Sequence, residues 1–210
     1  MPARTVAVFD FDGTLTKGDT LVPFLVAVAG RAAVVRALGR DPVGLALGAA
    51  RIGDRDAAKE RVLTRVLRGR PYDDVCTLGR KFAGRVSSEA VTAGARERIE
   101  QHRRAGHDIV IASASLDVYL DDVARVLDVE HLVCSRLEVD ERGRCTGRLQ
   151  GANCRGEEKA ARLRAYLDGD DVEMWAYGNS RDDDAMLALA QHPVRVKRGR
   201  FGAPVPSGSR

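Results

Sequence analysis

The sequence lacks the cysteine patterns of a zinc site and of a disulfide-stapled domain. Its 210 residues include four cysteines, none in a CxxC pair, and no histidine stands at zinc-finger spacing. Isolated cysteines are typical of reduced thiols, so we expect a cytoplasmic protein without disulfides. The chain enters an apolar, strand-like segment almost at once, without the charged region and long apolar stretch of a signal peptide.

A long apolar run is also missing. The most apolar stretch, residues 20–35, is interrupted by Arg31. It falls short of the roughly 20 apolar residues that a membrane-spanning helix needs. We expect residues 21–35 to form a helix packed in a small domain, and peripheral contact with a membrane surface is the alternative.

There is no strong excess of charge of one sign. The 34 Lys and Arg residues against 30 Asp and Glu give a formal net charge of +4. The arginines are dispersed among acidic residues on helix-like segments, whereas a nucleic-acid binder more often has a clustered basic patch. We therefore expect no nucleic-acid partner, although a mildly basic surface favours a small phosphorylated substrate.

Strand-like and helix-like segments alternate along most of the chain. After a short apolar run, Ala, Leu, Val and Arg recur at helical spacing up to about residue 90, and strands and helices then alternate, with one strand expected over 131–139. This order predicts an α/β fold with a parallel sheet and helices on both faces. We expect a Rossmann-like core at 1–16 and 91–198, a helical cap inserted at 17–90, and a flexible, frayed tail at 199–210.

Polar residues follow the expected strands. Asp10 and Asp12 close the first strand, Ser113 closes the second, Asn179 opens an acidic run after the later strand VEMWAYG, and Lys159 opens a helix. Taken singly, each has an ordinary explanation as a helix cap, a solvated lysine or an acid near a helix N-terminus. Because ligands of such sheets bind at the carboxyl ends of the strands, we expect these residues to share one site.

The close spacing of two carboxylates at the end of the first strand needs an explanation. Asp10 and Asp12 project to the same side of an extended chain and repel each other unless a cation lies nearby. Mg²⁺ suits a few hard oxygen ligands, and the alternative is that one carboxyl group is protonated. We expect one to attack as a nucleophile and the other to act as acid and base. Gly13 allows a tight turn with amide groups facing an anion.

Four short segments occur along the chain in this order: DFDGT, SAS, the lysine of GEEK, and GNSRDDDAML. Together they resemble the four signature motifs of the haloacid dehalogenase (HAD) superfamily, over nearly the whole chain. The stretch between the second and third motifs is most similar to the phosphoserine-phosphatase-like branch, subfamily IB. The resemblance implies a HAD core with a small helical cap, and a Mg²⁺-dependent phosphatase that works through an aspartyl-phosphate.

The resemblance also implies roles for individual residues. Asp10 corresponds to the nucleophile, and Asp12 to the general acid and base whose backbone carbonyl binds the metal. Ser113 and Lys159 would hold the transferring phosphoryl group. The implied residues that ligate or orient Mg²⁺ are Asp10, Asp12, Asn179 and Asp183.

The fourth motif departs from the usual pattern in two places. Asn179 stands where aspartate is common, which removes a charge from the metal site. Asp182 stands where a small or neutral residue is frequent. Asp182, Asp183 and Asp184 are therefore rival candidates to face the metal, and the spacing favours Asp183.

Two further positions bear on the substrate. Asp19 stands where phosphoserine phosphatases have a glutamate that recognises the substrate amine, and Arg61 is the candidate for their cap arginine. The ordinary alternatives are a helix N-cap for Asp19 and a solvated helix face for Arg61. The implied substrate-binding residues are Gly13, Thr14, Asp19, Arg61 and Ala114.

We expect a phosphatase of small phosphomonoesters, such as phosphoserine, histidinol phosphate or the phosphate of a phospholipid headgroup. The alternative is a catalytically weak protein of the same fold that binds a partner through its basic surface. Trp175 is expected in the core. The four histidines match no motif and are expected on the surface or beside strands: His102, His107, His131 and His192.

Overall fold

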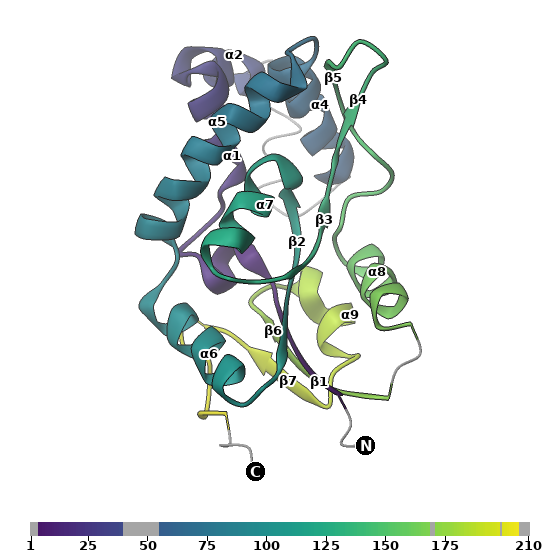
Figure 1. Cartoon of the computed structure of the whole chain (residues 1–210). Helices are drawn as coiled ribbons and strands as arrows, with labels where there is room; N and C mark the ends of the chain where they lie inside the picture. The colour runs from purple at the N-terminus through teal and green to yellow at the C-terminus, as the bar shows by residue number, and fades with distance from the viewer. Residues whose placement is uncertain (1–3, 40–54, 169–170, 198, 206–210) are drawn as a thin grey trace.

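The computed structural model describes residues 4–39, 55–168, 171–197 and 199–205. A five-stranded, all-parallel sheet with the strand order β3-β2-β1-β6-β7 occupies its lower half (Figure 1). This confirms the predicted α/β fold. Successive strands extend to one side of β1 and then to the other, so the strand order reverses beside β1. The strands are β1 (Arg4–Phe9), β2 (Asp108–Leu116), β3 (His131–Ser135), β6 (Val172–Gly178) and β7 (His192–Arg195).

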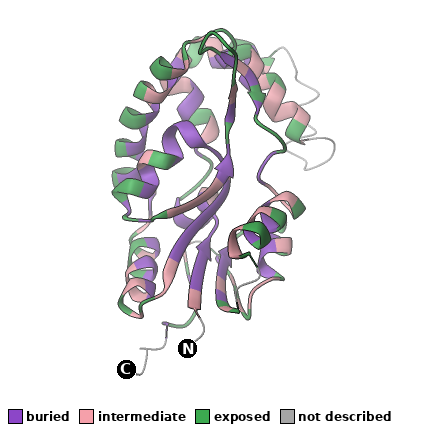
Figure 2. Cartoon of the chain, turned by 45° about the vertical axis from the view of Figure 1, so that its right-hand side comes forward, coloured by how far each residue is buried: buried purple, intermediate pink, exposed green. Residues whose placement is uncertain are grey.

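The central strand β1 is buried on both faces. Val6 and Val8 belong to one hydrophobic cluster, and Ala7 and Phe9 belong to the other, as the alternation of side chains along a strand requires. The strands form the buried centre of the molecule in Figure 2. Helices α8 (Glu157–Leu167) and α9 (Asp184–Leu187) cover the valine face, and α6 (Ala93–Arg104) and α7 (Asp117–Val126) cover the other.

Between β1 and β2, and before α6, the described chain forms four α-helices, which lie at the end of the molecule opposite the termini (Figure 1). We call them the helical insert. Its Phe24 and Phe82 pack against Tyr119 of α7, with ring centroids 4.8 and 5.3 Å away. Residues 40–54 lie outside the described ranges, and the cap boundaries at 17 and 90 stay a prediction. The insert consists of α1 (Leu21–Ala29), α2 (Arg31–Gly39), α4 (Arg55–Leu67) and α5 (Tyr72–Arg85).

The sequence suggested one strand over 131–139, and this prediction is wrong. The chain leaves the sheet after Ser135, because the backbone N–H of Leu137 donates to Asp117 Oδ1 (3.1 Å) instead of to a neighbouring strand. The next segment pairs in a separate antiparallel hairpin that packs on α4. At Gly147 a Cβ would lie 2.3 Å from Thr64 Cα, so only glycine permits this approach. The hairpin consists of β4 (Leu137–Val139) and β5 (Cys145–Leu149).

Three other expectations concern the α6 face of the sheet. In the described part of the tail, Phe201 is only 5% exposed and Gly202 accepts a hydrogen bond from Arg98 (3.1 Å), so residues 199–205 are packed rather than frayed. His102, expected on the surface or beside a strand, is fully buried and contacts Tyr177 of β6. It follows Arg98 by four residues, so both side chains lie on the helix face that meets the sheet. Trp175, expected in the core, is only partly buried and stacks on a histidine ring.

Three short turns complete the chain path. They are two π-helical turns, η1 (Phe11–Leu15) and η2 (Val86–Ala90), and one 3-10 turn, η3 (Arg181–Asp183). Within the described ranges, every helix is too short or too polar to reach across a bilayer.

Candidate active site

A cleft of about 600 Å³ opens where β1, β2 and β6 end, between the sheet and helix α4 of the insert. It lies where the strand order reverses, which is the usual binding position in open α/β sheets. Both Asp10 and Asp12 line it, together with Ser113, Lys159 and Asn179. The polar residues predicted at separate strand ends are therefore brought together.

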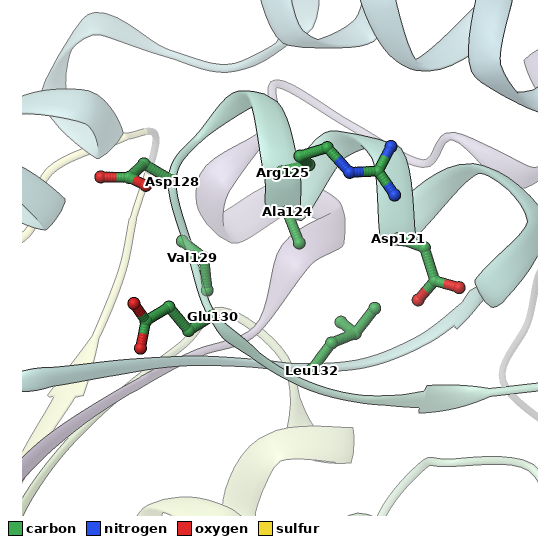
Figure 3. Close-up of a pocket in the computed structure, with 7 residues that line it drawn as sticks. All are labelled: Asp121, Ala124, Arg125, Asp128, Val129, Glu130 and Leu132. Carbon is green, nitrogen blue, oxygen red and sulfur yellow. The ribbon is translucent and has the colours of Figure 1, made fainter.

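A second hollow, of about 410 Å³, lies between α7 and β3 (Figure 3). Its charged side chains are Asp121, Arg125, Asp128 and Glu130. It contains neither the paired aspartates nor a lysine, so the chemistry expected from the sequence belongs to the first cleft.

The turn η1 carries the chain from β1 into the cleft. Gly13 has φ +77°, and a Cβ there would lie 2.1 Å from Asn179 Nδ2, so the turn and its neighbour together require glycine. The N–H of Gly13 donates to Thr16 Oγ1 (3.2 Å). This hydrogen bond occupies one amide of the turn, and the expectation that amide groups of the turn face an anion stays a prediction for its other N–H groups.

Asp10 is held from the core side of the cleft. Its Oδ1 accepts a hydrogen bond from Lys159 Nζ (2.8 Å), and its Oδ2 accepts one from Thr14 Oγ1 (3.0 Å). Burial raises the pKa of Asp10, and the positive charge of Lys159 opposes that rise. Thr14 is fully buried behind Asp10 and does not line the cleft, so its predicted contact with substrate becomes a contact with Asp10.

Lys159 is a buried ammonium group between two carboxylates. It is 2% exposed and donates to Asp183 Oδ1 (2.7 Å) as well as to Asp10. Burial lowers its pKa, but the two carboxylates outweigh burial and leave that pKa raised, so the lysine stays charged. Asp10, Lys159 and Asp183 together carry a formal charge of −1, so a bound cation would not be repelled by this group.

Of the three neighbouring aspartates, Asp183 is the one that turns inward. Its Oδ2 accepts hydrogen bonds from the N–H groups of Asn179 (3.1 Å) and Ser180 (3.0 Å). Asp182 instead pairs with Arg55, and Asp184 with an arginine of β7. Oδ2 of Asp183 is filled by these donors, whereas Oδ1 accepts from Lys159 and keeps an open lone pair, so both implied roles, orienting and ligating Mg²⁺, stay predictions.

The residues present fit a magnesium ion. Across the described ranges, no three His, Cys, Asp or Glu side chains gather as a metal site, so any ion here depends on a mixed set of oxygens. The Asn179 carboxamide is exposed beside Gly13, and within the described chain it has no hydrogen-bond partner. Asp10 and Asn179 would supply side-chain oxygens and Asp12 its backbone carbonyl, a sparse hard set of the kind Mg²⁺ accepts while keeping waters.

Asp12 is held from the opposite side of the cleft, by neutral groups. Its Oδ1 accepts from the N–H (3.0 Å) and the hydroxyl (2.7 Å) of Thr20, and its Oδ2 accepts from Ser115 Oγ (2.6 Å). Burial raises the pKa of Asp12 to about 7, Asp19 adds to the rise, and the Ser115 and Thr20 hydroxyls oppose it. A carboxyl group with such a pKa can hold or release a proton near neutral pH.

The C-terminal end of β2 forms one wall of the cleft. Ser113 is buried, and its Oγ accepts the N–H of Ser115 (3.0 Å). The carbonyl of Ala114 accepts a hydrogen bond from Lys59 Nζ (2.6 Å). Asp19 also lines the cleft, where a substrate-binding residue would lie. Its Oδ1 accepts the N–H of Leu21 at the start of α1, as a residue that caps the helix would.

Arg61 is the predicted site residue that the structure places elsewhere. It lines a separate hollow on the far side of α4. Two residues along a helix correspond to about 200° of rotation, so when Lys59 faces the cleft Arg61 faces away from it. Its expected role in the site is corrected accordingly.

Lys59 is the residue that the sequence interpretation missed. Besides Ala114, it donates to Asn153 Oδ1 (2.7 Å), and burial lowers its pKa to about 8 against the opposing charge of Asp56. Arg55 lies four residues earlier and also lines the cleft. This i,i+4 spacing of cations is visible in the sequence, but it does not show which face of the helix meets the core.

The fold and the paired aspartates define a hydrolase of the α/β class whose site lies under a helical insert. The haloacid dehalogenase-like hydrolase model matches residues 7–188, and the chain belongs to this family. Relatives include Protein CicA of Caulobacter vibrioides, 34% identical over 91% of this chain and 86% of that protein. A Mycobacterium tuberculosis protein named as a probable phosphatase is 30% identical over 94% and 70%.

Solved structures share the fold. A structure titled as a phospho-aspartyl intermediate analogue of phosphoserine phosphatase superposes with a TM-score of 0.66 at 17% identity, over 92% of this chain and 85% of that one. A Bordetella pertussis protein with unknown function superposes with a TM-score of 0.79 at 24% identity, over 92% and 90%.

Proposed function

We propose that this phosphatase of the haloacid dehalogenase family hydrolyses a small phosphomonoester through a phospho-aspartyl intermediate on Asp10, with Mg²⁺ bound. The observation that carries the proposal is the contrast between the partners of the two aspartates. Asp10 accepts a hydrogen bond from the ammonium group of Lys159, whereas Asp12 accepts hydrogen bonds from the neutral amide and hydroxyl of Thr20 and the hydroxyl of Ser115. Such a separation of environments assigns a nucleophile and an acid. The phosphatase name of the Mycobacterium tuberculosis relative supports the same class of reaction.

In the first step, a carboxylate oxygen of Asp10 attacks the phosphorus atom. The bond from phosphorus to the leaving oxygen breaks, and that oxygen takes the proton of Asp12. Lys159 and Ser113 hold the charged phosphoryl oxygens, which is the main work of catalysis in phosphoryl transfer. Bound Mg²⁺ would add neutralisation of negative charge.

In the second step, Asp12 is ionised and acts as a base. It takes a proton from a water molecule, whose oxygen attacks phosphorus and displaces the Asp10 carboxylate as inorganic phosphate forms. Asp183 accepts four hydrogen bonds, one from Lys159 and three from the segment after β6. These hydrogen bonds keep Lys159 and that segment in place.

The cleft also bears on the substrate. Lys59 is a buried ammonium group whose two acceptors, Ala114 O and Asn153 Oδ1, are both neutral. Asp19 brings a negative charge to the same cleft. An alcohol that carries both an anionic and a cationic group would pair with both residues, which favours phosphoserine over histidinol phosphate or a lipid headgroup.

The test is release of inorganic phosphate from a panel of phosphomonoesters with Mg²⁺, comparing the wild type with Asp10→Asn. We expect rapid turnover of one or two compounds, and loss of turnover in the variant or with EDTA. Absence of turnover of every ester, aryl phosphates included, would contradict the proposal. It would favour the catalytically weak binding protein, whose partner should dissociate with salt.

A further inference from the structure

A chain of hydroxyl groups leads from the Asp12 carboxylate into the interior. Thr20 Oγ1 donates to Asp12 Oδ1 (2.7 Å) and lies 2.9 Å from Tyr119 Oη. A threonine hydroxyl has a single proton, so Tyr119 must donate to Thr20. Ser115 Oγ donates to the other oxygen, Asp12 Oδ2 (2.6 Å). Thr20, Ser115 and Tyr119 are all buried, and no motif of the sequence assigned a role to any of them.

The far end of this chain is fixed by packing. The Tyr119 ring lies against Phe24 and Phe82 of the helical insert, with the Phe82 ring edge-on at 86°. Phe24 also donates its N–H to the carbonyl of Thr20 (3.0 Å), which begins α1. Close packing leaves these groups little freedom, so the position of the Asp12 carboxyl group depends on where the insert meets α7.

The two oxygens of Asp12 are not equivalent. Oδ1 accepts two hydrogen bonds, both from Thr20, whereas Oδ2 accepts one, from Ser115. A carboxylate oxygen has two lone pairs, so Oδ2 retains an open acceptor position. Asp12 and Ser115 both line the cleft.

We infer that Ser115 and Tyr119 are positioning residues for Asp12, which hold its carboxyl group so that Oδ2 gives the proton to the leaving alcohol. Ser115 acts directly, and Tyr119 acts through Thr20. The inference rests on the proposed phosphatase mechanism and deepens it. Positioning within a fraction of an ångström matters because proton transfer requires a hydrogen bond to the leaving oxygen.

The leaving group provides the test. The constant kcat/KM covers the formation of the Asp10–phosphorus bond and the departure of the alcohol. An alkoxide needs the Asp12 proton, whereas p-nitrophenolate leaves without it. We expect Ser115→Ala and Tyr119→Phe to lower kcat/KM for the best alkyl phosphate by about tenfold or more, and for p-nitrophenyl phosphate by about threefold at most. Asp12→Asn should show the same selectivity with a larger loss.

Matched variants separate positioning from folding. Tyr72→Phe removes another tyrosine hydroxyl that donates to a carboxylate, Asp117 Oδ2 (3.1 Å), away from the cleft, and should leave both esters unaffected. Thr20→Ser keeps the hydroxyl and should restore most of the activity that Thr20→Val loses. Urea unfolding of each variant shows whether the fold persists.

Two results would overturn the inference while leaving the phosphatase proposal intact. Equal losses for both esters would make these hydroxyls merely structural, and unchanged kcat/KM for the alkyl ester would show that they do not position Asp12. Absence of turnover of both esters by the wild type would instead overturn the proposed function, and the inference with it.

Discussion

The two walls of the cleft hold their aspartates by different means. On the core wall, Asp10 contacts the buried ammonium group of Lys159. On the insert wall, the hydrogen bonds that Asp12 accepts from the described residues come from neutral groups, the amide and hydroxyl of Thr20 and the hydroxyl of Ser115, and the charge of Lys59 interacts with it without a hydrogen bond. Both carboxylates are buried in the same cleft, two residues apart.

The difference shows how one turn supports two chemical roles. A charged partner stabilises the ionised form of a buried carboxylate much more than neutral donors do. Asp10 is therefore suited to attack phosphorus, and Asp12 to carry a proton. The sequence motif brings the two aspartates together, but the elements that surround them, α8 on one side and the start of α1 with the end of β2 on the other, distinguish them.

The largest expected effect comes from removing the cation of the core wall. In Lys159→Met, Asp10 and Asp183 lose their shared partner, so we expect kcat/KM to fall at least about 100-fold. The free energy of unfolding at pH 7 should fall by about 3 kcal/mol, because two buried carboxylates are left without a counter-charge. Phosphate release and urea unfolding measure the two effects.

The exposed Lys81→Met is the matched control, and should change the free energy of unfolding by less than about 0.5 kcal/mol. If Lys159→Met were as active and as stable as this control, Lys159 would not define the core wall.

A smaller effect should distinguish two cations of α4. Lys59→Met should lower kcat/KM about tenfold for esters whose alcohol bears an anionic group, and less for neutral alcohols, because a buried ammonium group is removed from the cleft. Arg61→Met, on the far side of the helix, should change either value by less than about twofold. The reverse ranking of these variants would mean that the orientation of α4 described here is wrong.

The smallest effect concerns the buried residues that pack behind the core wall. His102 is buried beside Tyr177, whose ring stacks on Phe9 next to Asp10, and its Nε2 lies 2.7 Å from the Tyr177 hydroxyl. Burial, with smaller contributions from His107 and Arg98, lowers the pKa of His102 to about 3. The unfolded chain binds a proton below about pH 6.5, whereas the folded chain does not until about pH 3.

Stability should therefore fall as the pH decreases from about 6.5 towards 3. His102 alone should lower the free energy of unfolding by about 1.4 kcal/mol between about pH 7.5 and pH 5.5. Urea unfolding at both values measures this, and His102→Gln should remove this difference of about 1.4 kcal/mol, which corresponds to about half a bound proton on average over the two pH units. An identical slope in the variant would contradict the buried, neutral state of this histidine.

Much of the fold could be predicted because its signals are local. The apolar run before Asp10 and the alternation of strands and helices after residue 90 indicate a parallel sheet, and strands end near where these patterns end. The break after Ser135 could not be predicted, because it depends on a hydrogen bond from Leu137 to Asp117 of another element. The buried state of His102 likewise depends on which face of α6 meets the sheet.

The residues of the candidate site also divide into those that the sequence predicts and those that it does not. Residues at strand ends, such as Asp10, Ser113 and Asn179, were predicted to meet because the sheet places its carboxyl ends together, and they line one cleft. Lys59 was missed in favour of Arg61, because the sequence does not show how the helix is rotated. Thr20 and Ser115 were not assigned roles either, since a hydroxyl group acquires one only through its three-dimensional neighbours.

The most direct test of the contrast between the two aspartates is an intact-mass measurement on Asp12→Asn mixed with p-nitrophenyl phosphate and Mg²⁺. The leaving group needs no proton, but the variant lacks the base that activates water. We predict accumulation of protein with one added phosphoryl group, located on Asp10 by peptide mapping, and no adduct when Asp10→Asn is added. Absence of the adduct in the single variant, or its location on another residue, would contradict the assignment of Asp10 as nucleophile and Asp12 as acid and base.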